Sequence, residues 1–297
     1  GIQMTFKSEI ILCGEPVKIS THSDGAVSIK IPTTFQPSWL ESNIWNIEAN
    51  IKDPSGMLAL IYLLDHLNTN ANFDGISFVL DLTYLPNARQ DRVTGDNDFE
   101  TPNTVKTFCN LLAGYKRLTT VYASDVHSNV PSVLLNNLAE QSHLHSYIVA
   151  VPLEVTDTID YFISPDLGAY KKVKSISQNY DTPYLVAQKE RDPISHEIEL
   201  SLTYDVDLTG KNVMICDDII DYGNSVQDLV KILKEKYNAA NVYIYATHGI
   251  LPLNKRLEVP SRFSFVTENV TGLFINSLWE DKDNPEIPEN VSYSLLF

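Results

Sequence analysis

The feature that most constrains the fold of this chain is the alternation of two kinds of segment along its length. Short runs rich in Val, Ile, Tyr and Phe alternate with segments of helical period over most of the sequence. This alternation is typical of parallel α/β units. Strands are predicted for residues 26–31, 76–82, 120–124, 161–164, 184–187, 212–216 and 241–246. Helices are predicted for residues 57–67, 103–115 and 226–237, where apolar side chains recur at helical spacing.

Chain length and the same alternation of segments predict the domain organisation. At roughly 100–200 residues per domain, 297 residues suggest two domains. No Gly/Ser-rich or low-complexity stretch divides the chain, but the alternation of strand-like and helical segments begins again near residues 145–151. We therefore predict an α/β domain over residues 1–146 and a second one over residues 147–297, although the two halves show no defensible sequence repeat.

The composition excludes several classes of function. With 38 acidic against 22 basic residues, the formal net charge is −16. This charge repels nucleic acids and anionic membranes, so neither is an expected partner, and a phosphorylated ligand must be met by a few local cations. The three cysteines lie far apart, and the apolar runs are well short of the ~18 residues that span a bilayer. These features favour a reducing, cytoplasmic location.

Residues 213–225 carry the clearest chemical signal. An apolar strand is followed by Asp217 and Asp218, then by the loop Asp-Tyr-Gly-Asn-Ser at 221–225, then by an amphipathic helix. Open parallel sheets bind ligands at the carboxyl ends of their strands. The loop and helix start can hold a phosphate, while the carboxylates can accept hydrogen bonds from ribose hydroxyls. The alternative is an acidic turn in which Ser225 caps the helix, but the order of these features favours the ligand site.

This segment is similar to the ribose 5-phosphate loop shared by phosphoribosyltransferases and ribose-phosphate pyrophosphokinases. The run Ala-Arg-Gln-Asp-Arg at residues 88–92 resembles the ATP-binding stretch of the pyrophosphokinases, and a nucleobase phosphoribosyltransferase would leave it without a purpose. Further matches follow in the family's order at residues 23–25, 125–128, 164–168, 189–191, 247–249 and 291–293. The resemblance implies two type I phosphoribosyltransferase-like, Rossmann-like domains, with residues 292–297 returning to the first.

The resemblance also implies how ATP and metal are bound. ATP would contact Arg89, Gln90, Asp24 and His127, since a cation and an amide suit triphosphate and adenine edges. A surface charge cluster is the alternative for Arg89 and Gln90. His127 and Asp166 would share one Mg²⁺ through its incomplete ligand shell.

The remaining site residues are implied in the same way. Lys189 and Arg191 would be the catalytic cations of a mobile loop, with a solvated turn as the alternative. Lys171 and Lys172 either add charge near the phosphates or cover a solvated helix face. The residues that would contact the ribose and phosphate of the acceptor are Asp217, Asp218, Asp221, Tyr222, Gly223, Asn224, Ser225 and Gly168.

The implied reaction is Mg²⁺-dependent transfer of pyrophosphate from ATP to the anomeric hydroxyl of a 5-phosphorylated ribose, with release of AMP. Ribose 5-phosphate is the family's default acceptor. ADP-ribose is the other candidate acceptor, because a phage-encoded branch of the family uses it in NAD rebuilding. Tyr222 also suits it, since this residue replaces a small one in the family's loop and could stack on an adenine; the alternative is that Tyr222 packs on a helix. A non-catalytic subunit is a less favoured interpretation. The family's ATP site crosses a subunit boundary, so a homodimer or homohexamer is expected.

Two further departures from the family concern nucleotide contacts and regulation. Residues 22 and 26 are His and Ala instead of Phe and Glu, so the usual adenine contacts from a neighbouring subunit are not expected. Asp96, Asp98 and Glu100 stand where relatives have basic and Ser residues that handle phosphate. We therefore predict that regulation by inorganic phosphate and ADP is lost.

Overall fold

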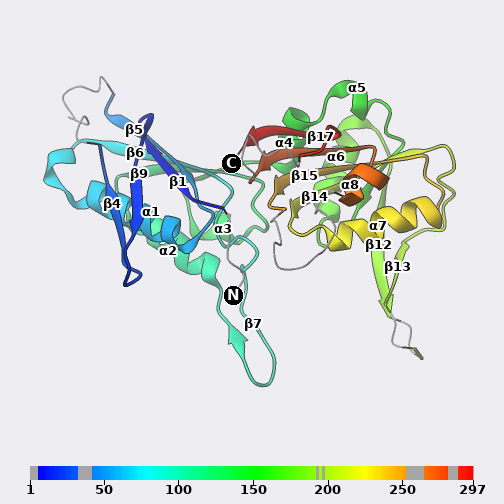
Figure 1. The fold of residues 1–297 in the computed structure, drawn as a ribbon, viewed down its shortest axis with the longest axis horizontal. Coiled ribbons are helices and arrows are strands. Elements are labelled where there is room, and N and C mark those ends of the chain that lie inside the picture. The colour runs from blue at the N-terminus through cyan, green and yellow to red at the C-terminus, as the bar shows by residue number, and fades with distance from the viewer. Residues whose placement is uncertain are drawn as a thin grey trace. The chain divides into compact units, whose positions relative to one another are not determined.

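The computed structural model of the protein describes residues 6–32, 42–191, 194–195, 198–251, 264–279 and 287–296 (Figure 1). The chain divides into two compact units, Gly1–Gln141 and Ser142–Phe297, so the division falls shortly before the expected boundary after residue 146. Each unit has a largely parallel sheet flanked by helices, which confirms the predicted α/β fold class. None of the described helices is long and apolar enough to cross a membrane.

The first unit is built on a six-stranded sheet in the order β10-β9-β6-β5-β1-β2. Strands β5, β6, β9 and β10 are parallel, whereas β1 and β2 pair antiparallel at one edge. The strands of this sheet are β1 (Glu9–Leu12), β2 (Glu15–Pro16), β5 (Ile44–Asn50), β6 (Ser77–Thr83), β9 (Leu118–Ser124) and β10 (Leu138–Gln141). The other elements are the hairpins β3 (Lys18–Thr21) with β4 (Val27–Lys30) and β7 (Thr94–Gly95) with β8 (Glu100–Thr101), and the helices α1 (Pro54–Thr69), η2 (Ala71–Phe73), α2 (Thr104–Gly114) and α3 (Val130–Leu134).

Helix α1 shows why the sequence forms these elements where it does. It begins after Asp53, whose carboxylate accepts the N–H of Gly56 at 2.9 Å, and Pro54 occupies its first turn. Both features are favourable at a helix start, since the cap satisfies an unpaired donor and Pro has none to lose. The predicted apolar stripe is confirmed, because its members Leu60, Leu63, Leu64 and Leu67 are all buried in the core.

The second unit is built on a seven-stranded sheet in the order β13-β12-β11-β14-β15-β16-β17, with only β13 antiparallel. The strands are β11 (Tyr161–Ser164), β12 (Tyr184–Arg191), β13 (Ile198–Leu202), β14 (Asn212–Ile220), β15 (Asn241–Gly249), β16 (Gly272–Leu278) and β17 (Val291–Leu296). The helices are α4 (His143–Ala150), α5 (Leu153–Thr156), α6 (Tyr170–Tyr180), α7 (Asn224–Glu235) and α8 (Ser264–Asn269).

Side-chain alternation along β14 sends its residues to two different cores. Val213 and Ile215 pack with the apolar stripe of α7. Met214 and Cys216 pack on the opposite face, in the core that holds buried residues of α4 and α6. Because successive strand residues point to opposite faces, Asp218 continues the face of Met214 and Cys216, toward α6.

Several strand ends differ from the prediction, and two of the differences affect the site. β14 continues past Cys216 to Ile220, because its pairing with β15 carries through to Ile220 opposite Gly249, so Asp217 and Asp218 lie within the strand and not after it. β12 likewise continues to Arg191, because it pairs with β13. Strand β17 (Val291–Leu296) pairs in parallel with β16 in the second unit's own sheet, and the expected return of residues 292–297 to the first domain stays a prediction.

Candidate active site

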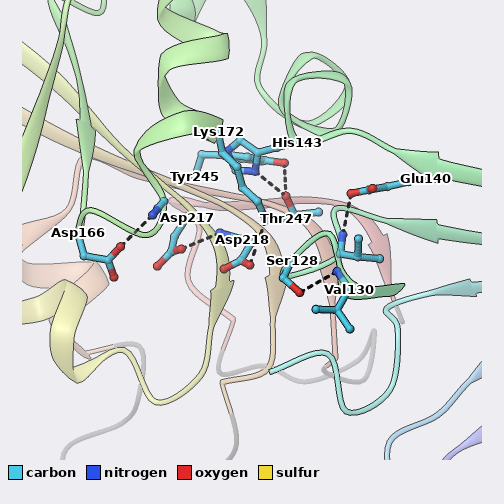
Figure 2. A network of polar contacts seen from close by, with 12 residues as sticks. Ser128, Val130, Glu140, His143, Asp166, Lys172, Asp217, Asp218, Tyr245 and Thr247 are labelled. Carbon is cyan, nitrogen blue, oxygen red and sulfur yellow. Dashed lines mark hydrogen bonds and ion pairs between the residues drawn. The ribbon is translucent and has the colours of Figure 1, made fainter. Parts of the chain in front are cut away.

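The acid pair of the second unit lies near the carboxyl end of β14. The backbone N–H of Asp218 donates to the Oδ1 of Asp217 at 2.8 Å, so the two carboxylates are held side by side. The side chain of Asp218 accepts from Lys172 Nζ of α6 at 3.2 Å (Figure 2). Two adjacent carboxylates at a strand end can accept hydrogen bonds from the two hydroxyls of a ribose.

The electrostatics of the pair are unusual. The pKa of Asp217 is raised well above its ordinary value, first by burial, next by the negative charge of Asp218, and to a smaller extent by Asp166. Burial disfavours the charged form of a carboxyl, and a neighbouring negative charge adds to that effect. The pair therefore holds a proton more readily than two exposed carboxylates would.

The loop between β14 and α7 provides a place for a phosphate. Gly223 has φ of 82°, a left-handed conformation that favours glycine, and it stands directly before the first residue of α7, Asn224. The first N–H groups of a helix have no acceptor within it and carry partial positive charge, so they suit an anion. The alternative in which Ser225 caps the helix is wrong, since Gly223 occupies the cap position. Tyr222 is 40% exposed.

A second loop of this unit follows β11. The carboxylate of Asp166 is exposed, and its Oδ1 accepts the N–H of Ala169 at 2.9 Å (Figure 2). The hydroxyl of Ser164 donates to the carbonyl of Asp166 at 2.7 Å, which fixes the turn. A Cβ at Gly168 would lie 3.1 Å from Asp166 Oδ1, so glycine there leaves room for the carboxylate.

Lys189 and Arg191 lie on β12, within the two-stranded arm that β12 and β13 form (Figure 1). Lys189 is opposite Leu200 and Arg191 is opposite Ile198. Residues two apart on a strand point to the same face, so both cations belong to one face of the arm. Lys189 is exposed. The side chain of Arg191 and the turn expected at residues 192–193 lie outside the described residues.

In the first unit, Arg89 and Gln90 are exposed in the loop after β6. The backbone N–H of Gln90 donates to the carbonyl of Asn87 at 2.8 Å, and Asn87 has a positive φ of 61°. The side-chain oxygen of Gln90 accepts a hydrogen bond from the hydroxyl of Thr104, the first residue of α2. This contact orients the amide of Gln90 next to a helix start.

His127 and Asp24 lie in two other turns of the first unit. His127 is exposed just after β9, in a turn where the carboxylate of Glu140 accepts the N–H of Val126 at 3.1 Å. Asp24 lies at the tip of the β3–β4 hairpin, where its Oδ1 accepts the N–H of Ala26 at 3.0 Å. Both residues are exposed at sharp turns, where a ligand can reach them.

Comparison with known proteins identifies the relatives of this arrangement. The ribose-phosphate pyrophosphokinase of Mycoplasma pneumoniae is 27% identical over 255 residues, which cover 84% of this chain and 72% of the relative. The ribose-phosphate pyrophosphokinase of Chlorobaculum tepidum is 26% identical over 288 residues, or 94% of this chain and 81% of the relative. This chain is thus similar to ribose-phosphate pyrophosphokinases over most of its length, at low identity.

A solved structure supports the fold of this chain. The phosphoribosylpyrophosphate synthetase of Mycobacterium smegmatis matches 93% of the chain and 85% of its own length, with a TM-score of 0.65 at 15% identity. No family model matches the chain. The low identities agree with the departures noted at residues 22, 26, 93–100 and 222.

The described residues contain no group of three or more His, Cys, Asp or Glu that could hold a metal ion. Mg²⁺ does not require one, since it usually keeps several waters and takes only one or two protein carboxylates besides substrate phosphates. The exposed, oriented carboxylate of Asp166 is an oxygen ligand of this kind. His127 lies in the other unit, so its sharing of a metal with Asp166 stays a prediction.

The structure thus brings together in the second unit the acid pair Asp217 and Asp218, the loop that begins at Asp221, and Lys172. Of the two neighbouring lysines, Lys172 contacts Asp218, whereas Lys171 is exposed. The sequence indicates this contact only indirectly. Alternation along β14 places Asp218 on the face of the sheet that α6 covers.

Proposed function

We propose that this enzyme transfers the pyrophosphoryl group of ATP to the anomeric hydroxyl of ribose 5-phosphate and releases AMP. The observation that carries the proposal is the order of three features along the chain: the acid pair near the carboxyl end of β14, Gly223 at positive φ, and the start of α7. These features offer hydroxyl acceptors and a phosphate cradle within a few residues of each other.

Each part of the acceptor has a matching group. The ribose hydroxyls would donate to Asp217, Asp218 and Asp221. The 5-phosphate would bind the backbone N–H groups of residues 223–225 at the start of α7. Since these groups are fixed by strand pairing and by the helix, they would hold the anomeric hydroxyl in place for attack on the β-phosphorus of ATP.

The ATP side of the reaction would use other residues. Arg89, Gln90, Asp24 and His127 would bind the nucleotide, and His127 and Asp166 would hold Mg²⁺, which neutralises phosphate charge when bound. Lys189 and Arg191 would stabilise the charge on the oxygens of the transferred group, because phosphoryl-type transfer depends more on positive charge than on a base.

ADP-ribose is the second candidate acceptor, and Tyr222 favours it. Tyr222 is 40% exposed at the phosphate loop, so the residue is not buried in the core of the unit. An exposed aromatic ring beside a bound phosphate can stack on an adenine attached to that phosphate. Ribose 5-phosphate offers no such group.

One experiment tests the activity and chooses between the acceptors. The protein is incubated with ATP, Mg²⁺ and either sugar phosphate, and AMP release and product mass are measured. Tyr222→Thr should lower turnover of ADP-ribose and leave turnover of ribose 5-phosphate nearly unchanged if the ring stacks. Tyr204→Thr, at another exposed tyrosine of the same unit, is the matched control. Absence of AMP release with both sugars would refute the proposed activity and favour a non-catalytic subunit.

We also propose a cytoplasmic location for this reaction. Cys13, Cys109 and Cys216 are free thiols, and the last two are buried. Free thiols are typical of proteins in a reducing compartment.

A further inference from the structure

Lys172 has an environment different from that of its neighbouring lysines. Helix α6 carries Lys171, Lys172 and Lys174 close to its start, and Lys171 and Lys174 are exposed. The side chain of Lys172 is only 24% exposed, and its ammonium lies 3.2 Å from the Oδ2 of Asp218, whose side chain is 10% exposed. Figure 2 shows the side chain reaching from the helix to the strand that carries the acid pair.

The position is unfavourable for a cation unless it has a partner. The N-terminal end of a helix carries partial positive charge, which repels an ammonium in the first turns. A partly buried lysine also loses hydration. The contact with Asp218 offsets both effects, because a paired and hydrogen-bonded charge is tolerated where a lone one is not. Asp218 gains equally, since it stands next to a second carboxyl at Asp217.

We propose that Lys172 is a positioning residue of the acceptor site, which holds the carboxylate of Asp218 in the orientation that receives the ribose hydroxyls. The inference rests on the proposed function and names one more residue of the same site. Lys172 binds one carboxylate oxygen, Oδ2, and a carboxylate has further acceptor positions for a hydroxyl. The ion pair therefore fixes the orientation of the Asp218 carboxylate.

The test compares KM values in matched variants. Lys172→Met should raise the KM for ribose 5-phosphate, or for ADP-ribose if that is the acceptor, by about tenfold or more, because a charge-assisted contact that orients the acid is lost. The KM for ATP and the kcat at saturating acceptor should change much less. Lys172→Arg should restore most of the affinity, because it keeps the charge. Lys174→Met, an exposed lysine of the same helix, is the control and should behave as wild type.

A double variant guards against loss of folding in Lys172→Met. The double variant Lys172→Met with Asp218→Asn is compared with the single variant Asp218→Asn, because neither leaves a buried carboxylate at position 218 without its lysine. The two should have the same KM for the acceptor, since Lys172 acts through Asp218. A further rise in KM in the double variant would overturn the role. If the wild-type enzyme is active and Lys172→Met has the same KM for the acceptor as Lys174→Met, the proposed role of Lys172 is overturned as well. A wild type that releases no AMP with either sugar refutes the proposed function itself.

Discussion

At the scale of single residues, Asp217 links the site to stability. Its pKa is raised in the folded chain by burial and by the charge of Asp218, so the folded state keeps a proton at a pH where the unfolded chain has released it. Ionisation then favours the unfolded state. The resulting loss of stability is absent below about pH 4, grows as the pH rises through the folded-state pKa, and is constant above it. The site thus lowers the stability of the second unit at neutral pH.

Asp217→Asn should therefore stabilise the protein at neutral pH. The amide keeps the oxygen that accepts the N–H of Asp218 but cannot ionise. The gain in the free energy of unfolding should be about 1.4 kcal/mol for each unit by which the pKa is raised, and it should shrink as the pH falls toward 4. Urea unfolding between pH 4 and 8 measures it, with Asp228→Asn on the exposed face of α7 as control. An advantage that stays constant with pH would contradict this explanation.

Lys189→Ala tests the proposed catalytic cation. Removing a charge that acts on the transferred group should lower kcat by about 100-fold or more. ATP binding, measured by calorimetry, should change little, because other residues hold the nucleotide. Glu190→Ala is the control, since alternation places Glu190 on the opposite face of β12. A Lys189→Ala enzyme with unchanged turnover would remove Lys189 from the mechanism.

At the scale of elements, the β7–β8 hairpin carries the carboxylates found in place of regulatory residues. Asp96 lies in its turn and accepts the N–H groups of Asp98 and Phe99, each at 2.9 Å. These bonds lower the pKa of Asp96, which is therefore charged at neutral pH. Asp96, Asp98 and Glu100 are all exposed, so the hairpin presents negative charge to solvent and repels phosphate.

Activity should therefore be independent of inorganic phosphate. We expect a flat rate from phosphate-free buffer to millimolar phosphate, and no inhibition by ADP beyond competition with ATP. The triple variant Asp96→Asn, Asp98→Asn, Glu100→Gln shows whether the charges matter, because it removes the repulsion without changing side-chain size. A rate that requires millimolar phosphate in the wild-type enzyme would refute the prediction.

At the scale of the whole molecule, the first unit has one hydrophobic core and the second has two, one on each face of its sheet. Each unit contributes a different set of the proposed ligand contacts. The ATP residues lie mainly in the first unit and the acceptor residues in the second. We predict that the enzyme assembles as a homodimer or homohexamer, as the family resemblance implies. Sedimentation should give a mass of two or six chains, and activity per chain should fall on dilution below the assembly's Kd. A monomer with full activity would contradict this prediction.

The sequence predicted much of the fold from local pattern. β11 was predicted with its bounds, Tyr161–Ser164, because it is a short apolar run with clear ends. β5 (Ile44–Asn50) was missed, since its buried Trp45, Ile47 and Ala49 alternate with polar residues and form no continuous apolar run. β16 was missed as well, because Asn276 and Ser277 are buried by partners on other segments, such as His248 for Ser277. Burial of a polar residue depends on such partners, which local pattern does not reveal.

The sequence by itself determined the α/β class and placed the acid pair and the glycine loop between a strand and a helix, because strand ends and helix starts are local features. The candidate ATP residues were implied by the family resemblance and stay a prediction. Only the tertiary structure decided that β14 runs through the acid pair, that Asp217 holds its proton more strongly, and that Lys172 pairs with Asp218. Lys172 and Asp218 are 46 residues apart in the chain. Their contact exists because α6 covers the face of the sheet to which Asp218 points, and that arrangement follows from the packing of the whole unit.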